Sequence, residues 1–421
     1  MSGVETSAAA LAAPRLSLRQ VLLCAAAILT LSMGIRHGFG LWLQPMTMER
    51  GWSRETFALA IAIQNLAWGL FAPIAGMVAD RFGAFRVLVV GSLLYAGGLV
   101  LMGLSTTGLA LAGSTGLMIG MAQAGTTYAV VYGVIARQVA PERRSWAMGV
   151  AAAAGSFGQF LMVPVENGLI ANFGWQQALF FLGCLALAIA PAAWWLREPK
   201  AAGPTAAAGP AGAAAQARQS IGQAVREAFG YRSFQWLMAG YFVCGFQVVF
   251  IGVHLPSYLK DHGMSPSVAS TALALVGLFN VIGTYVAGTL GQRLAKRHIL
   301  STIYLLRSVA ITLFLLAPLT PASVYVFASV MVVLWLSTVP PTNAVIAQIF
   351  GVQYMSMLSG FVFFSHQVGS FLGAWLGGRL YGLTGSYDIV WGLAIALGVF
   401  AALANLPVRE TPIVRAQPQP A

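Results

Sequence analysis

The sequence predicts an all-α membrane protein with twelve transmembrane helices, arranged as two pseudo-symmetric six-helix bundles. Three observations lead to this prediction. Of the 421 residues, 58% are hydrophobic and 8% are charged, whereas about a quarter of the residues of a soluble domain are charged. Apolar runs of about 20 residues, the length that crosses a bilayer as a helix, recur along the chain. A motif that follows the second run returns in weaker form about half a chain later.

The apolar runs define the spans and the domains. The stretch from Arg197 to Ser220 is rich in Ala, Gly and Pro, which predicts a flexible linker between the sixth and seventh spans. The expected units are an N-terminal tail (1–19), a first bundle (20–196), a linker (197–232), a second bundle (233–407) and a C-terminal tail (408–421). We expect spans at 20–44, 54–78, 87–106, 109–136, 146–171, 175–196, 233–258, 266–290, 299–318, 321–347, 355–382 and 386–407.

The basic residues predict the topology. If both termini are cytoplasmic, seventeen of the 23 Lys and Arg residues fall in cytoplasmic segments, as the positive-inside rule requires. The polar N-terminal segment, with Arg15 and Arg19 before the first span, is interpreted as a cytoplasmic tail and not as a cleavable signal. The formal charge of +12 then faces anionic lipid headgroups and requires no nucleic-acid partner. We therefore expect a multi-pass protein of a bacterial inner membrane.

A sequence repeat indicates that the two bundles are related. The stretch GMVADRFGAFR begins at Gly76, after the second span, and GTLGQRLAKRH begins at Gly288, after the eighth. The two copies are 212 residues apart, and each has an Arg five residues after its first Gly. Internal repeats of six-helix units are a hallmark of secondary transporters.

The first copy resembles the loop motif G-x-x-x-D-R-x-G-R-R of the major facilitator superfamily. The second copy departs from it, with Gln292 in place of the Asp and Ala295 in place of the Gly. In this family the motif is a cytoplasmic latch, so we expect Asp80 to accept hydrogen bonds from a helix N-terminus of the other half. Arg81 would bind carboxylates or headgroups; the alternative is that these charges only follow the positive-inside rule. The expected latch residues are Gly76, Asp80, Arg81, Gly83, Arg86 and Arg293.

Three further stretches resemble the monocarboxylate-porter and oxalate:formate-antiporter group within this superfamily. They are GIRHGFGLWLQPMTMERGWS in the first span and its exit, GLFNVIGTYVAG in the eighth and GFVFFSHQVGSFLG in the eleventh. The resemblance implies that His37 and His366 stand where the group has substrate-contacting residues. The chain departs from the group at Thr284, which takes the place of a substrate-binding Arg in the eighth span.

Ionisable groups inside the spans are the main candidates for a site, because an Arg in the bilayer centre costs about 3 kcal/mol. Arg36 is interpreted as an anion-binding group, or alternatively as an Arg bound to carbonyls between helices. His37 and His366 are expected to line the path and to be able to respond to pH. Arg307 lies in the peripheral ninth span, where a structural role is expected. Glu166 is a candidate proton carrier, but it could equally pair with a base or cap a broken turn.

Neutral polar residues complete the candidate substrate site, although hydrogen bonding between helices explains each of them equally well. The resemblance implies that the first, fourth, seventh and tenth helices line the path. The candidate substrate-binding residues are Arg36, His37, Gln123, Tyr128, Gln159, Gln247, His254, Asn280, Asn343 and His366, and the proton-coupling candidates are His37, Glu166 and His366.

Other chemistry has no counterpart in the sequence. No phosphate-binding loop of the G-x-x-x-x-G-K-[ST] type occurs, so ATP is not expected to drive the protein. No Ser-His-Asp arrangement and no metal-ligand spacing is present, and the three cysteines fall within apolar runs. We therefore expect no enzymatic activity, no cofactor and no metal.

These observations predict a secondary transporter that works as a monomer. It would move a small organic anion, most simply a carboxylate, across the inner membrane by alternating access. The alternative is a proton-driven exporter of drugs or hydrophobic compounds, and a third reading is a sensor that keeps the fold without transport. The sequence leaves the substrate, the direction of transport and the use of protons open.

Overall fold

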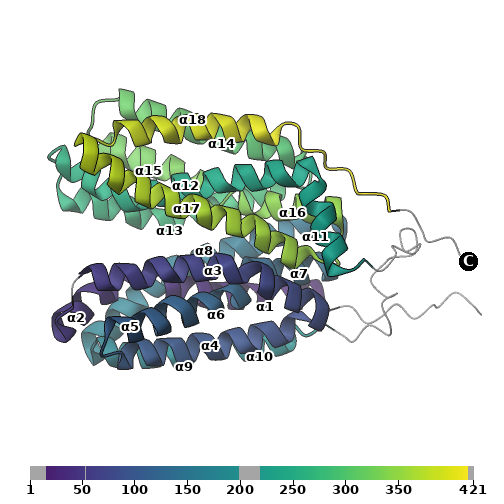
Figure 1. Cartoon of the computed structure of the whole chain (residues 1–421), viewed down its shortest axis with the longest axis horizontal. Helices are drawn as coiled ribbons and strands as arrows, with labels where there is room; N and C mark the ends of the chain where they lie inside the picture. Colours follow the sequence, from purple (N-terminus) through teal and green to yellow (C-terminus); the bar gives the residue numbers. More distant parts are fainter. Residues whose placement is uncertain (1–15, 53, 199–218, 416–421) are drawn as a thin grey trace, which may run out of the picture.

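The computed structural model describes residues 16–52, 54–198 and 219–415, and this part of the chain contains helices and no strand. The predicted tail segment 1–15, the linker segment 199–218 and residues 416–421 lie outside the described residues. Figure 1 shows two elongated helical bundles side by side, the first in purple and blue and the second in teal to yellow.

The first bundle contains the spans predicted for the N-terminal half, and several of these spans are divided into shorter helices. Its elements are α1 (Leu18–His37), α2 (Gly40–Arg50), α3 (Arg54–Phe82), α4 (Ala84–Leu104), α5 (Gly108–Leu111), the π-helical η1 (Ala112–Met118), α6 (Ile119–Thr126), α7 (Tyr128–Gln138), α8 (Pro141–Phe173), α9 (Trp175–Ala186) and α10 (Ile189–Trp195).

The second bundle follows a short helix in the predicted linker, α11 (Ile221–Gly230). Its elements are α12 (Arg232–Asp261), α13 (Pro266–Leu290), α14 (Lys296–Leu316), α15 (Pro321–Trp335), α16 (Val339–Phe350), α17 (Met355–Thr384) and α18 (Asp388–Asn405).

Length and hydropathy agree with a membrane-spanning protein. In the described chain, ten helical segments are long and apolar enough to cross a bilayer. The helices α13 and α17, with 25 and 30 residues, are also long enough at about 1.5 Å per residue. Together they give the twelve spans that the sequence predicts, so the predicted fold class is confirmed.

The helix contacts repeat between the two bundles. In the first bundle α1 packs on α8, α3 on α6 and α4 on α9; in the second, α12 packs on α17, α13 on α15 and α14 on α18. These are the same pairings after a shift of six spans. The contacts between the bundles follow the same rule, because α3 meets α17 and α8 meets α13. The repeat in the sequence is therefore a repeat in the packing.

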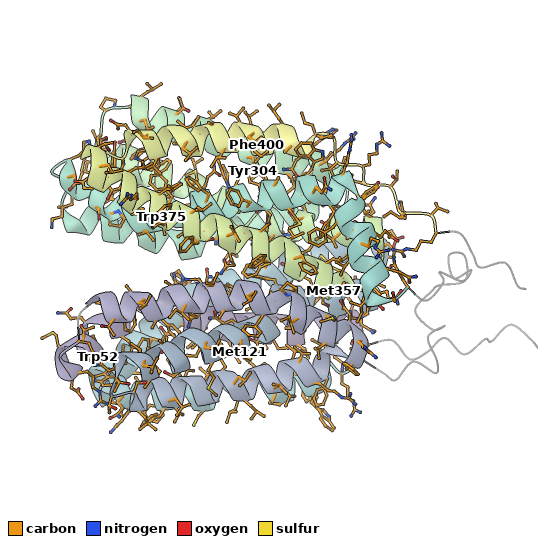
Figure 2. The ribbon with its side chains drawn as sticks, viewed as in Figure 1. Trp52, Met121, Tyr304, Met357, Trp375 and Phe400 are labelled. Carbon is orange, nitrogen blue, oxygen red and sulfur yellow. The ribbon has the colours of Figure 1, made fainter. Side chains whose placement is uncertain are left out.

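The bundles touch closely at one end of the molecule, which we call the linker end. It holds α11, the start of α1 and residues 408–415 (right in Figure 1). The backbones approach at Gly149 and Gly288, where an added Cβ on Gly149 would lie 2.8 Å from the Gly288 Cα atom. Met357, at the start of α17, also lies at the contact between the bundles (Figure 2). The described close contacts therefore hold the two bundles together at the linker end.

Two spans are interrupted at equivalent places, which the sequence did not predict. The fourth span breaks between α6 and α7, at Thr127, whose backbone is extended. The tenth breaks between Trp335 and Val339, just before Pro340. Thr126 and Thr338 differ by 212 positions, the spacing of the sequence repeat. Paired interruptions in corresponding spans of a transporter mark the neighbourhood of its binding site.

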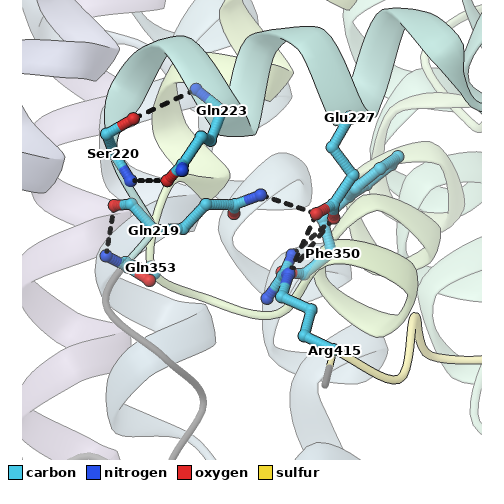
Figure 3. Close-up of polar contacts among 7 residues, drawn as sticks. All are labelled: Gln219, Ser220, Gln223, Glu227, Phe350, Gln353 and Arg415. Atoms are coloured by element: carbon cyan, nitrogen blue, oxygen red, sulfur yellow. Dashed lines mark hydrogen bonds and ion pairs between the residues drawn. The ribbon is translucent and has the colours of Figure 1, made fainter. Parts of the chain in front are cut away.

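The helix α11 is fixed to the second bundle by polar contacts (Figure 3). Ser220 and Gln223 form a reciprocal capping box at its start, which supplies partners for two otherwise free amides. Glu227 forms an ion pair with Arg415, with 2.7 Å between Oε1 and Nη2. Gln219 donates a hydrogen bond from Nε2 to Glu227. Burial opposes the effect of these partners, but the hydrogen bonds from Arg415 dominate and lower the pKa of Glu227.

Candidate functional site

A small cavity of about 20 Å³ lies where the bundles meet, with room for about one water molecule. Both broken spans contribute to its wall, as do α3, α12 and α17. Tyr128 and Asn343, two of the predicted site residues, line it. The full lining is Trp68, Ala72, Thr127, Tyr128, Ala129, Tyr241, Asn343, Ser359, Val362 and Phe363.

The break in the fourth span turns a helix N-terminus toward this cavity. Thr127 makes no side-chain capping bond to α7; its hydroxyl instead donates to the Gln123 carbonyl (2.7 Å) and accepts from the Trp68 indole (3.1 Å). The first amides of a helix have no partner within it, and the N-terminus carries a partial positive charge. The buried hydroxyls of Tyr128 and Ser359 have no hydrogen-bond partner among the described residues. The cavity wall therefore includes hydroxyl groups that are free to donate a hydrogen bond to a bound solute.

Arg36 supplies a full positive charge beside the cavity. Its guanidinium donates from Nη2 to the Asn65 side chain at 2.5 Å, and its Cζ atom lies 4.7 Å from the centroid of the Trp68 ring. Among the described residues no ion pair involves Arg36. The charge is therefore held by neutral groups, one of which is part of the cavity wall.

His366 lies on the other side of the cavity, in α17. Its ring stacks on Phe363 with centroids 5.6 Å apart and packs against Tyr241 at 5.2 Å; both aromatic residues line the cavity. Its Nδ1 atom lies 3.1 Å from the Gln367 Oε1 atom. The predicted histidine thus supports two residues of the wall.

A chain of hydrogen bonds connects Arg36 to His366 across the two bundles. Asn65 accepts from Arg36 with its side chain and from the Gln367 amide with its carbonyl, at 2.7 Å. Gln367 is the neighbour of His366 and lies within hydrogen-bond distance of it. These hydrogen bonds beside the cavity therefore join the two bundles.

Several predicted residues lie outside this cavity. Gln123 is fully buried beside Tyr95 in the first bundle, Gln159 is buried in α8, and His37 is exposed with no described hydrogen bond. In the second bundle Gln247 donates to the Ala394 carbonyl, His254 lies 2.9 Å from the Ala374 carbonyl and Asn280 accepts from the Leu336 amide. Asn343 does line the cavity, but its side-chain amide donates within its own helix to the Val339 carbonyl. The bonds in the second bundle join helices or turns of that bundle, as helix-packing residues do.

Arg307 has the structural environment that its position in the sequence predicts. It is fully buried and donates to the Leu334 carbonyl from Nε (3.2 Å) and Nη2 (2.5 Å), and from Nη2 to the Trp335 carbonyl (2.5 Å). These are the last carbonyls of α15, which lack partners because the helix ends there. Arg307 therefore caps the broken tenth span.

Glu166 lies inside the first bundle, against the turn that separates α1 from α2. Its side chain is fully buried, and neither carboxyl oxygen has a hydrogen-bond partner among the described residues. It does not line the central cavity.

The latch motif lies at the linker end. Asp80 accepts a hydrogen bond from the amide of Met357, in the first turn of α17, at 2.8 Å. Its other oxygen pairs with Arg137 at 2.8 Å, and Arg137 also pairs with Glu198 at 2.7 Å. Arg137 was not among the latch residues expected from the sequence. Its position in the last turn of α7 gave no signal beyond its charge.

The other motif residues differ in their surroundings. Gly76 packs on the backbone at Ser356, where a side chain would collide, and Gly83 joins α3 to α4 at a φ of 91° that favours glycine. Arg81, Arg86 and Arg293 are exposed. Arg86 lines an apolar groove between α3, α4 and α6, and Arg293 faces the start of α8 across the bundle boundary. Only Gly76 and Asp80 make described close contacts across the boundary.

Comparisons with known proteins agree with this architecture. The family model described as Major Facilitator Superfamily matches residues 22–373 and 237–421. Relatives include monocarboxylate transporter 13 of Rattus norvegicus (26% identical; 90% of this chain and 86% of the relative), the probable sulfoacetate transporter SauU of Cupriavidus necator (26%; 84% and 86%) and the uncharacterized MFS-type transporter YcxA of Bacillus subtilis (22%; 88% and 90%).

Solved structures with a similar fold include sugar symporters. The fucose:proton symporter FucP of E. coli matches with a TM-score of 0.69 at 14% identity, covering 92% of this chain and 98% of the symporter. The proton:xylose symporter XylE matches with a TM-score of 0.67 at 15% identity, covering 92% and 94%.

Proposed function

The chain belongs to the major facilitator superfamily, and from that premise we propose that it carries a small organic anion across the membrane by alternating access. The anion is of the carboxylate type, or a sulfonate of similar size. Relatives named for monocarboxylates and for sulfoacetate support this substrate class. In such a cycle the two bundles open a central site to one side of the membrane at a time.

The observation that carries the proposal is the unpaired charge of Arg36. Its guanidinium has only neutral described partners, and the residues that line the cavity include no acid. The N-terminus of α7 and the hydroxyl of Tyr128 add donors on the same wall. In the described conformation the cavity has room for about one water molecule, so the bundles must part to admit an anion. The bound anion would then gain charge-assisted hydrogen bonds, and the attraction is stronger where water is scarce.

The remaining candidates have supporting roles in the proposal. His366 and Asn343 would close the site from the second bundle, His37 would attract the anion from the exposed end of α1, and protons would be co-transported. We treat Gln123, Gln159, Gln247, His254 and Asn280 as packing residues, because they are buried and most of them bond to backbone groups away from the cavity.

The orientation is also a proposal. We infer from the positive-inside rule that the linker end and both termini are cytoplasmic, in a bacterial inner membrane. Because the bundles touch at the linker end, the conformation described here is then closed to the cytoplasm. Asp80 and Met357 stabilise this closed state, and a functional monomer is sufficient for the cycle.

The test is transport by purified protein in liposomes. Uptake of radiolabelled pyruvate, lactate and sulfoacetate is measured for the wild type, for Arg36→Gln and for Arg379→Gln, which removes an exposed charge from the outer part of α17. We expect uptake of at least one anion, lost in Arg36→Gln and kept in Arg379→Gln. Wild-type uptake that survives in Arg36→Gln would refute the proposed site.

One observation favours a second function, the export of hydrophobic compounds. Four aromatic side chains, Trp68, Tyr128, Tyr241 and Phe363, line the cavity, and such a wall also suits apolar or cationic drugs. Efflux of a lipophilic cation from the same liposomes, driven by a pH gradient and unaffected by Arg36→Gln, would favour this alternative over the anion carrier.

A further inference from the structure

We propose that Glu166 is a proton-binding site, and that its proton must be present for Arg36 to hold an anion. The first part stands on the geometry of α1 and α8 alone. The second part rests on the proposed function, because it concerns the substrate of the same site.

The carboxyl group has a seat formed by the packing of α1 on α8. Every fourth residue of α1 faces α8: the Thr30 hydroxyl donates to the Ala154 carbonyl at 2.9 Å, and a Cβ on Gly34 would lie 2.8 Å from the Gly158 carbonyl oxygen. One turn further, a Cβ on Gly38 would take the place of the Glu166 Oε2 atom. The carboxyl group therefore fills the space of the missing side chain at the turn between α1 and α2.

The seat offers the carboxyl group no partner. Glu166 is 0% exposed, and both of its oxygens lack a hydrogen bond among the described residues. An ionised carboxylate in such a place loses its hydration and gains nothing in return, at a cost of many kcal/mol. A bound proton removes the charge, so this conformation requires the protonated acid.

Charged and titratable groups surround the seat but do not neutralise it. On α4, Tyr95 interacts electrostatically with both Glu166 and Arg36, and its hydroxyl donates to the Ser32 carbonyl. On α1, Arg36 and His37 directly precede Gly38, but the Arg36 guanidinium turns to Asn65 on α3.

The other neighbouring elements contribute no free base. On α2, Glu49 accepts from the Trp175 indole, and the Arg50 guanidinium donates to the Gly103 carbonyl. The titratable side chain of α9 is Cys184, which is exposed. No described group other than Arg36 or His37 can offer a nearby positive charge to a deprotonated Glu166.

The coupling follows from charge balance. When the proton leaves to water, Glu166 becomes an anion at the turn that directly follows Arg36 and His37, and it then competes with the substrate anion for the charge of Arg36. When the proton returns, the charge of Arg36 is available to the substrate anion. The protein then binds one proton and one anion together, and its net charge does not change. Proton and anion are therefore expected to bind with positive cooperativity, which is reciprocal.

The first experiment needs no substrate. Infrared spectra of the full chain in lipid nanodiscs are recorded across a pH titration for the wild type, Glu166→Gln and the control Glu198→Gln. We expect a carbonyl band of a protonated, unbonded carboxylic acid that persists to alkaline pH in the wild type and in Glu198→Gln, and is missing in Glu166→Gln. The same band in all three proteins, or none in the wild type, would overturn the proton site.

The second experiment measures linkage, with pyruvate and sulfoacetate as probes. Calorimetry in buffers of different ionisation enthalpy counts protons taken up with the anion. Above the titration range of Glu166, we expect the wild-type affinity to fall about tenfold per pH unit, with one proton taken up. Glu166→Gln, whose amide resembles the protonated acid, should bind without pH dependence or proton uptake, and the control Arg379→Gln should behave like the wild type.

The two proposals fail in different ways. If no probe binds to the wild type while the infrared band is present, the proposed function fails and the proton site stands. If Glu166→Gln binds the anion with the wild-type pH dependence, the coupling is overturned. Should Glu166→Gln not fold, Gly38→Ala, which removes the seat, must shift or abolish the same band, and an unchanged band would refute the proton site.

Discussion

Replacing Asp80 by Asn tests how much one charge contributes to the closed linker end. The Asp80 carboxylate accepts a 2.8 Å hydrogen bond from the Met357 amide in the other bundle. A hydrogen bond to a charged group contributes about 1.5–3 kcal/mol, and a neutral one about 0.5–1.5 kcal/mol. The charge also interacts with the positive N-terminus of α17, for about 0.3–1 kcal/mol. Together the substitution is expected to weaken the closed state by about 2 kcal/mol, a shift of about 30-fold in the opening equilibrium.

The distance between two spin labels, measured by double electron-electron resonance, reports the opening equilibrium. Labels at Phe82 and Leu294 are suitable, because both side chains are exposed at the linker end and belong to different bundles. The exposed Cys184 is first replaced by Ser. We expect the Asp80→Asn protein to show a larger population at long distance than the parent, and the binding of an anion to change that population.

Glu198→Gln is a matched control. The substitution removes a carboxylate charge that, like the charge of Asp80, pairs with Arg137; the Arg137 Nε atom lies 2.7 Å from the Glu198 Oε1 atom. Glu198 makes no described contact with the second bundle. Its distance distribution should stay close to that of the parent protein. A distribution for Asp80→Asn that is unchanged, or a shift of equal size in Glu198→Gln, would show that the contact with α17 does not hold the closed state.

Three further predictions concern other parts of the molecule. Arg307→Ala should lower the midpoint of thermal unfolding by several degrees, because each buried carbonyl left without a partner costs about 1–3 kcal/mol; an unchanged midpoint would contradict the capping role. Gly149→Ala should open the linker end in the spin-label assay, because the added methyl group meets the Gly288 backbone, and a closed distribution would contradict this. The lowered pKa of Glu227 means that its pairing with Arg415 stabilises the fold above the ordinary Glu pKa and is lost as pH falls through the lowered value. Arg415→Met should therefore remove part of the acid sensitivity of thermal unfolding, and an unchanged pH profile would argue against the pair.

The fold was largely predictable from the sequence because the bilayer imposes one strong rule on apolar runs. Apolar runs long enough to cross a bilayer predicted the twelve spans. The motif at Gly76 and its copy at Gly288 predicted that the two bundles are related. The breaks in the fourth and tenth spans were not predictable, since they depend on groups that are distant in sequence. Arg307 and Asn280 form hydrogen bonds with backbone groups at the second break. The sequence around residues 334–338 does not indicate that these two side chains will be its partners.

The candidate site was predictable only where charge made residues conspicuous. Arg36 and His366 stand out in apolar runs, and the structure places them on opposite sides of one cavity. Trp68, Tyr241 and Phe363 also line that cavity, but an aromatic residue in a span has the same appearance in the sequence whether it faces lipid, a neighbouring helix or a cavity. The partner of the Asp80 carboxylate within its own bundle, Arg137, was missed for a related reason, because its charge already satisfied the topology rule.

The backbone-to-backbone contacts at the linker end also determine how readily the bundles can part. Where Gly149 meets Gly288 and Gly76 meets the Ser356 backbone, these glycines contribute no side chain that must change rotamer on separation. Freezing or releasing a long side chain changes the free energy by up to about 2 kcal/mol, and this term is small for a glycine. The resistance to separation at these points then comes mainly from dispersion and a few polar bonds, so the bundles can part there without repacking side chains.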